Sequence, residues 1–466
     1  MTSDVLLMDF AGLSRSLGAR HFSFSGSKGF SSVSIDSRTA EQGSLFVALP
    51  GSVTDGHCHI TEAFNAGAAC AMVESAKLES FNIIDIAQKL GKDLLAVDNT
   101  LQGLQDTARI YLDKFPKLLK IGITGSTGKT TTKEIAAAII VAEKNTVMNK
   151  GNLNSETGLP LSAFSVRGEH EAGIFEMGMN RKGEIAELAR VLKPNIALVT
   201  NIGHAHIGIL GTKQEIAEEK KNIFSCFTDN DIALIPQEDQ YRDFLAQGLR
   251  GRIRFYGADS FAELEEVRSM GLEGSEIRWA GEKIHFALPG KHFLADALAA
   301  IAIAREVSVS CGAIKKGLES VRPMFGRTEI LKGRCTVIRD CYNASPESVE
   351  KTLEFCDSLD WPGKRIYVLA DMLELGENSP AAHGQIGRLL AESKADGIFL
   401  FGKEITAAAS VLTERGMSFF HTEDIQELSA ALDRGIQNSD LVLLKGSRGC
   451  ALERLSGILT GVNNVS

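Results

Sequence analysis

The segment GSTGKT, residues 125–130, has the residue types and spacing of a loop that binds phosphate. It follows an apolar run predicted as a strand, LLKIGIT, and precedes a predicted helix, TTTKEIAAAIIVAEK. Backbone N–H groups at such a helix start can hold phosphate oxygens, Lys129 can neutralise their charge, and the Thr130 hydroxyl can bind Mg²⁺. Because Ile123 stands at the first glycine of the strict G-x-x-x-x-G-K-[ST] pattern, we expect a shorter variant loop. The alternative is a glycine-rich turn without a ligand.

Potential metal ligands follow two further predicted strands. Glu176 ends the apolar run AGIFE, and His204 and His206 follow NIALV. Open α/β sheets place ligand-contacting groups at the carboxyl ends of their strands. Glu176 is therefore a candidate Mg²⁺ ligand, and one of the two histidines suffices as another. The alternative for the histidines is a structural role.

Two turns in the last third of the chain carry groups suited to an anionic ligand. RDCYNASPES places Asp340 and Asn343 after one apolar strand, and KGSRG places Lys445, Ser447 and Arg448 after another. Cations and small polar groups at a strand-to-helix turn can bind an anion, although surface loops have the same composition. From the pattern alone, these turns could be an anion-binding site or ordinary surface loops.

The elements that must position these residues fall into three regions. Residues 1–112 mix short strands (SSVSI, SLFVAL, CAMVE) with turn-rich pieces, which predicts a small α/β domain. Residues 113–322 alternate apolar strands with helices, which predicts a mainly parallel sheet covered on both faces. Residues 323–466 repeat this alternation with RIYVLADM, GIFLFG and DLVLLKG, which predicts a Rossmann-like α/β domain.

Composition narrows the classes of function. The 466 residues carry a formal net charge of -9 without a long basic run, so nucleic acid is not an expected partner. The start, MTSDVLLMDFAGL, lacks a basic n-region, and no apolar stretch approaches the ~20 residues that span a bilayer. The eight cysteines form no C-x-x-C pair, which argues against a zinc site or a disulfide framework. We expect a cytoplasmic protein without membrane insertion, and a monomer.

The motifs together resemble the Mur ligase family over nearly the whole chain. The resemblance rests on their order and spacing: DSR, LFVALPG and DGH in the first region, then GSTGKTTTKE, GNLNSETGLPLS, EMGMN, TNIGHAH, EEKKNIF, LPGKHF, FGRTE, DCYNASPES, ADMLELG and KGSR. The most similar members add D-alanyl-D-alanine to UDP-N-acetylmuramoyl-tripeptide through an acyl phosphate formed with ATP. The resemblance implies a UDP-substrate domain, a central ATP-binding domain and a C-terminal domain for the amine substrate.

The resemblance also implies roles for individual residues. Catalysis would depend on Lys129, Glu176, His206 and Lys220. ATP would be bound by Gly125, Ser126, Thr127, Gly128, Lys129, Thr130, Thr131, Asp296, Arg327, Asp340 and Asn343. The UDP-sugar would lie near Ser37, Arg38, Asp55 and His57, the muramoyl peptide near Asn152 and Asn154, and the amine substrate near Lys445, Ser447 and Arg448. Two Mg²⁺ ions would be held by Thr130, Glu176, His206 and Lys220.

The role of Lys220 depends on this resemblance. By pattern alone, the lysines of IAEEKKNIF form a solvated helix face. The spacing from Lys220 to Phe224 matches the family's K-x-x-[IL]-[FY], whose first lysine is carbamylated. A carbamate would turn a cation that repels Mg²⁺ into an anionic ligand.

Three positions depart from the family pattern. Ser155 and Phe293 stand where asparagines are usual, and Asp296 replaces the asparagine thought to read adenine. An ionised Asp296 could only accept hydrogen bonds, whereas an amide also donates. The alternative is that Asp296 points to solvent and another residue contacts the base.

Other functions compete with this reading. A sibling ligase would add diaminopimelate, lysine or glutamate, but the D-N-P-R signature of the diaminopimelate-adding enzyme is absent. Folate-polyglutamate ligases share the phosphate loop, but DSR and DGH fit a UDP-sugar better. A non-catalytic nucleotide-binding protein would not need Lys129, Glu176, His206 and Lys220 together.

Overall fold

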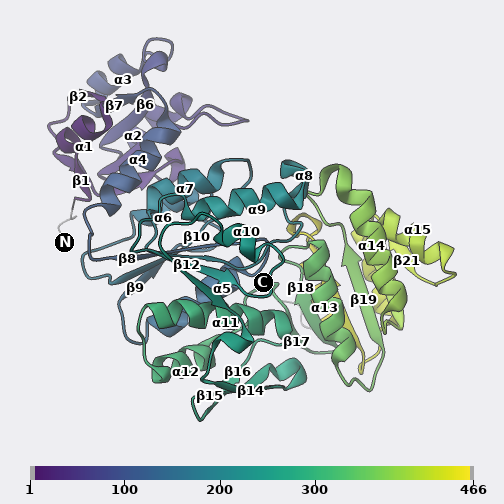
Figure 1. Ribbon diagram of the computed structural model, residues 1–466. Coiled ribbons are helices and arrows are strands. Elements are labelled where there is room, and N and C mark those ends of the chain that lie inside the picture. The colour runs from purple at the N-terminus through teal and green to yellow at the C-terminus, as the bar shows by residue number, and fades with distance from the viewer. Residues whose placement is uncertain (1–5, 462–466) are drawn as a thin grey trace.

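The computed structural model describes residues 6–461 and contains one five- or six-stranded sheet in each of the three predicted regions. Figure 1 shows three lobes, with the N-terminal one set apart above the central one and the C-terminal one beside it. We call the parts around these sheets the N-terminal unit (8–112), the central unit (119–320) and the C-terminal unit (329–460). The predicted α/β fold with mainly parallel sheets is confirmed.

The N-terminal unit is built on a sheet of order β2-β7-β6-β5-β4, in which β2 is antiparallel to β7 and the other pairs are parallel. A short antiparallel pair, β1-β3, lies beside it. Its strands are β1 (Met8–Asp9), β2 (Arg20–Phe22), β3 (Gly29–Phe30), β4 (Ser32–Ser34), β5 (Ser44–Val47), β6 (Cys70–Glu74) and β7 (Asp93–Val97). Its helices are α1 (Phe10–Leu17), η1 (Ser37–Thr39), η2 (Gly56–His59), α2 (Ile60–Ala66), η3 (Ser75–Lys77), α3 (Ile83–Leu90) and α4 (Thr100–Leu112).

The central unit has an all-parallel sheet of order β13-β12-β11-β8-β10-β9. Its strands are β8 (Leu119–Thr124), β9 (Thr146–Met148), β10 (Ala172–Glu176), β11 (Ile196–Val199), β12 (Ile232–Pro236) and β13 (Arg252–Tyr256). Its helices are α5 (Lys129–Ile140), α6 (Gly158–Ala163), α7 (Glu184–Leu192), α8 (Ile207–Leu210), α9 (Lys213–Lys221), η4 (Asn222–Phe224), α10 (Arg242–Ala246), η5 (Ala258–Ser260), η6 (Gly271–Glu273), α11 (Lys291–Glu306) and α12 (Cys311–Ser320). A further antiparallel sheet, which the sequence patterns did not predict, is formed by β14 (Leu264–Ser269), β15 (Ser275–Trp279) and β16 (Glu282–Phe286).

The C-terminal unit has a sheet of order β17-β18-β22-β19-β20-β21, parallel except for the edge strand β17. Its strands are β17 (Glu329–Lys332), β18 (Thr336–Asp340), β19 (Arg365–Ala370), β20 (Gly397–Phe401), β21 (Phe420–Thr422) and β22 (Leu441–Lys445). Its helices are α13 (Pro346–Ser358), η7 (Gly376–Asn378), α14 (Ser379–Glu392), α15 (Thr406–Glu414), α16 (Ile425–Gly435), η8 (Arg448–Cys450), η9 (Leu452–Leu455) and α17 (Ser456–Thr460).

The order of the central strands explains where a ligand can bind. The chain passes from β10 to β11 across β8, so β8 lies at the point where the strand order reverses. Parallel sheets bind ligands at the carboxyl ends of the strands beside such a point. The phosphate-loop candidate follows β8, Glu176 ends β10, and the two histidines follow β11. The predicted strand ends therefore meet at one edge of the sheet.

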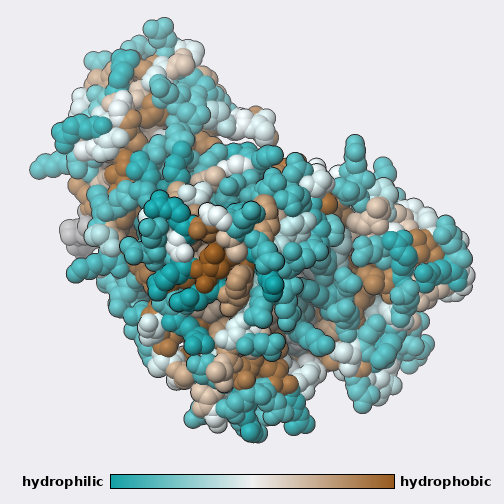
Figure 2. All heavy atoms as spheres, viewed as in Figure 1, coloured by the Kyte–Doolittle hydropathy of each residue, from teal (hydrophilic) through white to brown (hydrophobic). Residues whose placement is uncertain are grey.

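The face of the molecule seen in Figure 2 is mainly hydrophilic. Hydrophobic residues gather on it in several patches, one of them near the middle of the view. Within residues 6–461, no helix is long and apolar enough to cross a membrane.

Candidate functional site

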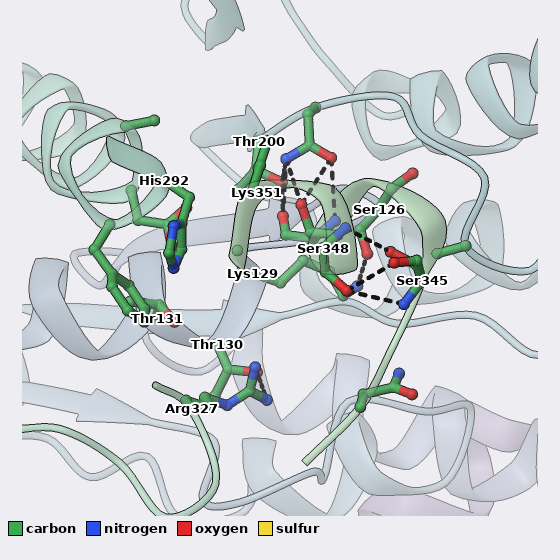
Figure 3. A pocket seen from close by; sticks show the side chains of 18 of the residues that line it. Ser126, Lys129, Thr130, Thr131, Thr200, His292, Arg327, Ser345, Ser348 and Lys351 are labelled. Atoms are coloured by element: carbon green, nitrogen blue, oxygen red, sulfur yellow. Dashed lines mark hydrogen bonds between the residues drawn. The ribbon is translucent and has the colours of Figure 1, made fainter. Parts of the chain in front are cut away.

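A cavity of about 630 Å³ lies between the central and C-terminal units, and it brings together most of the predicted ATP and metal residues. Predicted residues lining it are Ser126, Thr127, Gly128, Lys129, Thr130, Thr131, Asn152, Asn154, Glu176, His206, Asp296, Arg327, Asp340, Asn343 and Lys445. The lining does not include Gly125, Lys220, Ser447, Arg448 or the candidates of the N-terminal unit: Ser37, Arg38, Asp55 and His57. Figure 3 shows Arg327 beside Thr130, and it shows Ser345, Ser348 and Lys351 among the side chains that line the same cavity.

The phosphate loop requires glycine at two positions. Gly125 has a φ of 152°, and a Cβ there would lie 1.8 Å from Thr200 Oγ1. Gly128 has a φ of 80° and lies against Asp296. Lys129 Nζ donates to the Gly125 carbonyl at 2.8 Å. Burial lowers the pKa of Lys129, against the opposing effect of Glu176. The short turn thus carries its cation beside the loop backbone.

Glu176 and His206 both present a buried atom without a hydrogen-bond partner among the described residues. Glu176 Oε1 accepts from Asn154 Nδ2 at 2.7 Å, which leaves Oε2 unpartnered. His206 Nδ1 has no hydrogen bond, although the Glu374 carboxylate lies 3.4 Å away. Burial, with help from Lys129 and Lys220, lowers the pKa of His206 to about 3, so the imidazole is neutral and able to bind a metal.

These two atoms and the Thr130 hydroxyl form a donor set that fits Mg²⁺, which prefers oxygen ligands and keeps part of its water shell. Within residues 6–461, no cluster of three or more His, Cys, Asp or Glu side chains has the arrangement of a metal site. The expected ligands, Thr130, Glu176, His206 and carbamylated Lys220, include only two residues of these types, so the expected set would not form such a cluster.

Lys220 is buried at 1% exposure, so the pattern-based reading of a solvated face is wrong for this residue. Burial and Lys129 lower its pKa well below the ordinary lysine value. The adjacent Glu219 carboxylate accepts from the backbone N–H groups of Gly183 and Ile185 at 2.7 and 2.9 Å. Lys221 instead anchors α9, since its Nζ donates to the carbonyls of Phe244 and Gln247.

The C-terminal side of the cavity is organised by Arg327 and Asp340. The Arg327 guanidinium donates through Nη2 to Thr130 Oγ1 at 3.1 Å. Its central carbon lies 4.3 Å from the centre of the Tyr342 ring. Burial acts to raise the pKa of Asp340, but the pKa is lowered overall. Among the lowering effects, that of Lys445 is the largest, and its Nζ lies 2.8 Å from Asp340 Oδ2. Lys445 also donates to the Asn343 carbonyl at 3.2 Å. Lys445 thus lies beside the expected nucleotide residues.

Asp296, on α11, is buried at 9% exposure and lines the cavity, so the alternative in which it faces solvent is wrong. The expectation of an ionised carboxylate at neutral pH is also wrong. Burial raises the pKa of Asp296 to about 8, despite the opposing effects of Lys351 and Arg327. A neutral carboxylic acid can both donate and accept a hydrogen bond, as an amide does.

The other expected substrate residues lie in local networks. The His57 side chain is fully buried, with Nδ1 2.6 Å from Asp55 and Nε2 accepting from the Glu74 amide. Ser37 donates to Glu62, and Arg38 is exposed and paired with Asp36. In the C-terminal unit, Ser447 Oγ accepts from the Leu373 amide, and Arg448 pairs with Glu453. His57 and Ser447 therefore shape their loops through these bonds.

Several lining residues were missed by the sequence analysis. They include His292, Tyr342, Ser345, Ser348 and Lys351. Ser345 and Ser348 form a capping box at the start of α13, and Lys351 follows one turn later. The spacing Ser-Pro-x-Ser could have predicted the helix start, but not that this turn faces the phosphate loop.

Comparison with known protein families gives three matches that together cover most of the chain. The Mur ligase family catalytic domain matches residues 29–109, the Mur ligase middle domain 123–304, and the Mur ligase glutamate ligase domain 326–448.

Individual proteins match over nearly their full length. The UDP-N-acetylmuramoyl-tripeptide–D-alanyl-D-alanine ligase of Treponema pallidum is 42% identical over 444 residues, 95% of this chain and 96% of that protein. The crystal structure of MurF from Acinetobacter baumannii superposes with a TM-score of 0.86 at 27% identity, covering 98% and 100% of the two chains. MurF ligase from Thermotoga maritima, in complex with ADP, gives 0.78 at 27% identity, covering 92% and 97%.

Proposed function

The chain belongs to the Mur ligase family, and we propose that it joins D-alanyl-D-alanine to UDP-N-acetylmuramoyl-tripeptide in an ATP-dependent step of peptidoglycan precursor synthesis. The observation that carries the proposal is the cavity between the central and C-terminal units, lined by the phosphate loop, Glu176, His206 and Arg327. The near-full-length similarity to a ligase of this specificity supports the choice over sibling enzymes. Use of ATP is supported by the similar ligase whose structure holds ADP.

The reaction has two steps. In the first, an oxygen of the tripeptide carboxylate attacks the γ-phosphorus of ATP, and the bond from this phosphorus to the β,γ-bridging oxygen breaks. ADP departs, and the tripeptide carries an acyl phosphate. The D-alanyl-D-alanine amine then attacks the acyl carbon, inorganic phosphate leaves, and the nitrogen loses a proton. We propose that the phosphate-loop amides and Lys129 bind the phosphate charge in the first step, and that Arg327 faces the γ-phosphate. The hydrogen bond from Arg327 to Thr130 supports this position.

We propose that Thr130, Glu176 and His206 bind Mg²⁺, which would neutralise the charge that develops on the phosphates. Lys220 is proposed to carry a carbamate and to help hold a second ion. Formation of a carbamate needs a neutral amine, and the lowered pKa of Lys220 supports this. The chain's own contribution is to present these groups in a buried site.

We propose that each of the three sequence regions binds a different substrate. Residues 1–112 would bind the UDP part near Ser37, Arg38, Asp55 and His57, and residues 113–322 would bind ATP. Residues 323–466 would supply Lys445, Ser447 and Arg448 on the amine side. Asn152 and Asn154 line the cavity, which supports contacts with the muramoyl peptide. We further propose a cytoplasmic monomer, because the reaction consumes ATP and the site lies within one chain.

Asp340 and Asn343 are proposed to face the nucleotide, and Asp296 to contact adenine. The burial of Asp296 in the cavity wall supports this contact. In its neutral form it could donate to N7 and accept from the N6 amine.

Product analysis by mass spectrometry tests the function. The ligated UDP-muramoyl pentapeptide should form only with ATP, Mg²⁺, the UDP-muramoyl tripeptide and D-alanyl-D-alanine together. Diaminopimelate- and lysine-containing tripeptides should be compared. Equal turnover with free glutamate in place of the dipeptide would contradict the assignment, and phosphate release without product would favour a nucleotide-dependent binding protein.

A further inference from the structure

A carboxylate at the start of α13 binds the loop that follows β11, although the two are 143 residues apart in sequence. Glu347 Oε1 accepts from the His204 backbone N–H at 2.7 Å and forms a short contact with His204 Nδ1. Glu347 follows Pro346 in the first turn of α13, where the helix dipole favours an anion. The helix start therefore fixes a carboxylate of the C-terminal unit on the central unit.

The same loop is joined to the phosphate loop. The Gly203 amide donates to Ser126 Oγ at 2.8 Å, and the Ser126 amide donates to the Asn201 carbonyl at 3.0 Å. A Cβ on Gly203 would lie 3.0 Å from the Glu347 carboxyl carbon, so the carboxylate packs directly on this glycine. Contact thus runs from α13 through Gly203 and His204 to the phosphate loop.

A second contact holds the other end of this segment. A Cβ on Gly208, in α8, would lie 2.5 Å from the Gly376 nitrogen and 2.6 Å from the Glu374 carbonyl oxygen. Backbone therefore meets backbone, with no flexible side chain to move aside. His206, which lines the cavity, lies between the two contacts with a φ of 67°.

We propose that Glu347 is a positioning residue, which sets loop 201–206 against the phosphate loop when the C-terminal unit docks. This inference rests on the proposed ligase function. Glu347 Oε2 is buried and has no hydrogen-bond partner among the described residues. Such an oxygen costs stability, so its presence in a native structure calls for an explanation, and a positioning role supplies one. The Glu347 carboxylate thereby links docking of the C-terminal unit to the geometry of the ATP site.

Hydrogen exchange of the full-length protein, without substrates, tests the linkage directly. Glu347→Gln removes the charge from the acceptor of the His204 amide, so exchange in the peptide covering 201–207 should rise about tenfold or more. Gly208→Ala suits a helix locally but collides with the docked loop, so it should raise exchange of the Gly203 and His204 amides as well. Glu354→Gln, at an exposed position of the same helix, is the matched control and should change neither.

Kinetics separate positioning from a general structural role. Glu347→Gln should lower kcat and raise the KM for ATP, while the KM for the UDP-muramoyl tripeptide stays unchanged. Unchanged exchange at 203–204 in Glu347→Gln, or a Gly208→Ala effect confined to α8, would overturn the proposal. If exchange responds as expected but no ligation occurs under any condition, the positioning inference stands and the proposed function fails.

Discussion

Asp296 of α11 lies directly against Gly128 of the phosphate loop. A Cβ on Gly128 would come within 2.1 Å of Asp296 Oδ1, and the φ of 80° at Gly128 independently favours glycine. The packing removes water from the carboxyl group, and this burial is the main cause of its raised pKa. One of the three residues that depart from the family pattern is therefore buried beside the loop expected to bind ATP.

The first prediction concerns stability. The pKa of Asp296 is about 8 in the folded chain against an ordinary value of 3.8, so between these values the folded chain holds a proton that the unfolded chain has released. Raising the pH through this window therefore favours unfolding, by up to about 1.4 kcal/mol per pH unit, and the effect levels off above about pH 8. Asp296→Asn removes the effect.

Thermal unfolding of the native chain and of Asp296→Asn from pH 5 to 9 measures this pH dependence of stability. The Asn variant should gain stability relative to the native chain as the pH rises, with little further gain above pH 8. A difference between the two forms that does not vary with pH would contradict the buried neutral carboxyl.

The second prediction concerns nucleotide affinity. Near pH 7 a protonated Asp296 can make both hydrogen bonds of an amide, so Asp296→Asn should bind ATP about as tightly as the native chain. Above about pH 8 the carboxylate loses its donor, and the native affinity should fall by one to two decades, the cost of about 1–3 kcal/mol for an unpaired polar group. Calorimetry at pH 6.5 and 9 checks this. If both forms show the same pH dependence, Asp296 does not contact the base.

Local patterns were enough to predict the elements that position the site. The apolar runs of β8, β10 and β11 and the glycine-rich turn each determine their conformation over a few residues. Because open α/β sheets place ligand-contacting groups at the carboxyl ends of their strands, the sequence predicted Glu176 and one of the histidines as candidate ligands near the phosphate loop. In the structure, Glu176 and His206 line the same cavity as that loop.

Contacts between distant segments could not be predicted in this way. No pattern links Glu347 to His204, since the two residues are 143 positions apart and their contact depends on how the central and C-terminal units pack together. The sequence EEKK is polar throughout, so periodicity did not distinguish buried Lys220 from its neighbour. Burial also reversed the expected charge state of Asp296, which residue type alone does not reveal.

The third prediction concerns Lys220. Lys220→Ala should remove most ligase activity, and added acetate should restore part of it by placing a carboxylate in the vacated volume. The measurement is initial rate against acetate concentration. Lys221→Ala, the matched control, should lose stability because its two carbonyl contacts anchor α9, but it should keep most of its activity below its melting temperature. Equal activity losses in the two variants would show that charge at Lys220 is not the cause.

The last prediction concerns Arg327. Its guanidinium is stacked on Tyr342 and donates to Thr130, and a lysine would keep the charge but lose the planar fork that makes both contacts. If Arg327 faces the γ-phosphate, Arg327→Lys should lower kcat by about ten- to a hundredfold, the range expected for one charge-assisted hydrogen bond. It should also weaken binding of a non-hydrolysable ATP analogue more than binding of ADP.

Arg322→Lys is the control, because Arg322 donates to the nearby backbone carbonyls of Glu319 and Val321 and does not line the cavity. Calorimetry with both nucleotides, alongside steady-state rates, separates the readings. Equal loss of ADP and analogue affinity would mean that Arg327 supports the phosphate loop through Thr130 and makes no contact with the γ-phosphate.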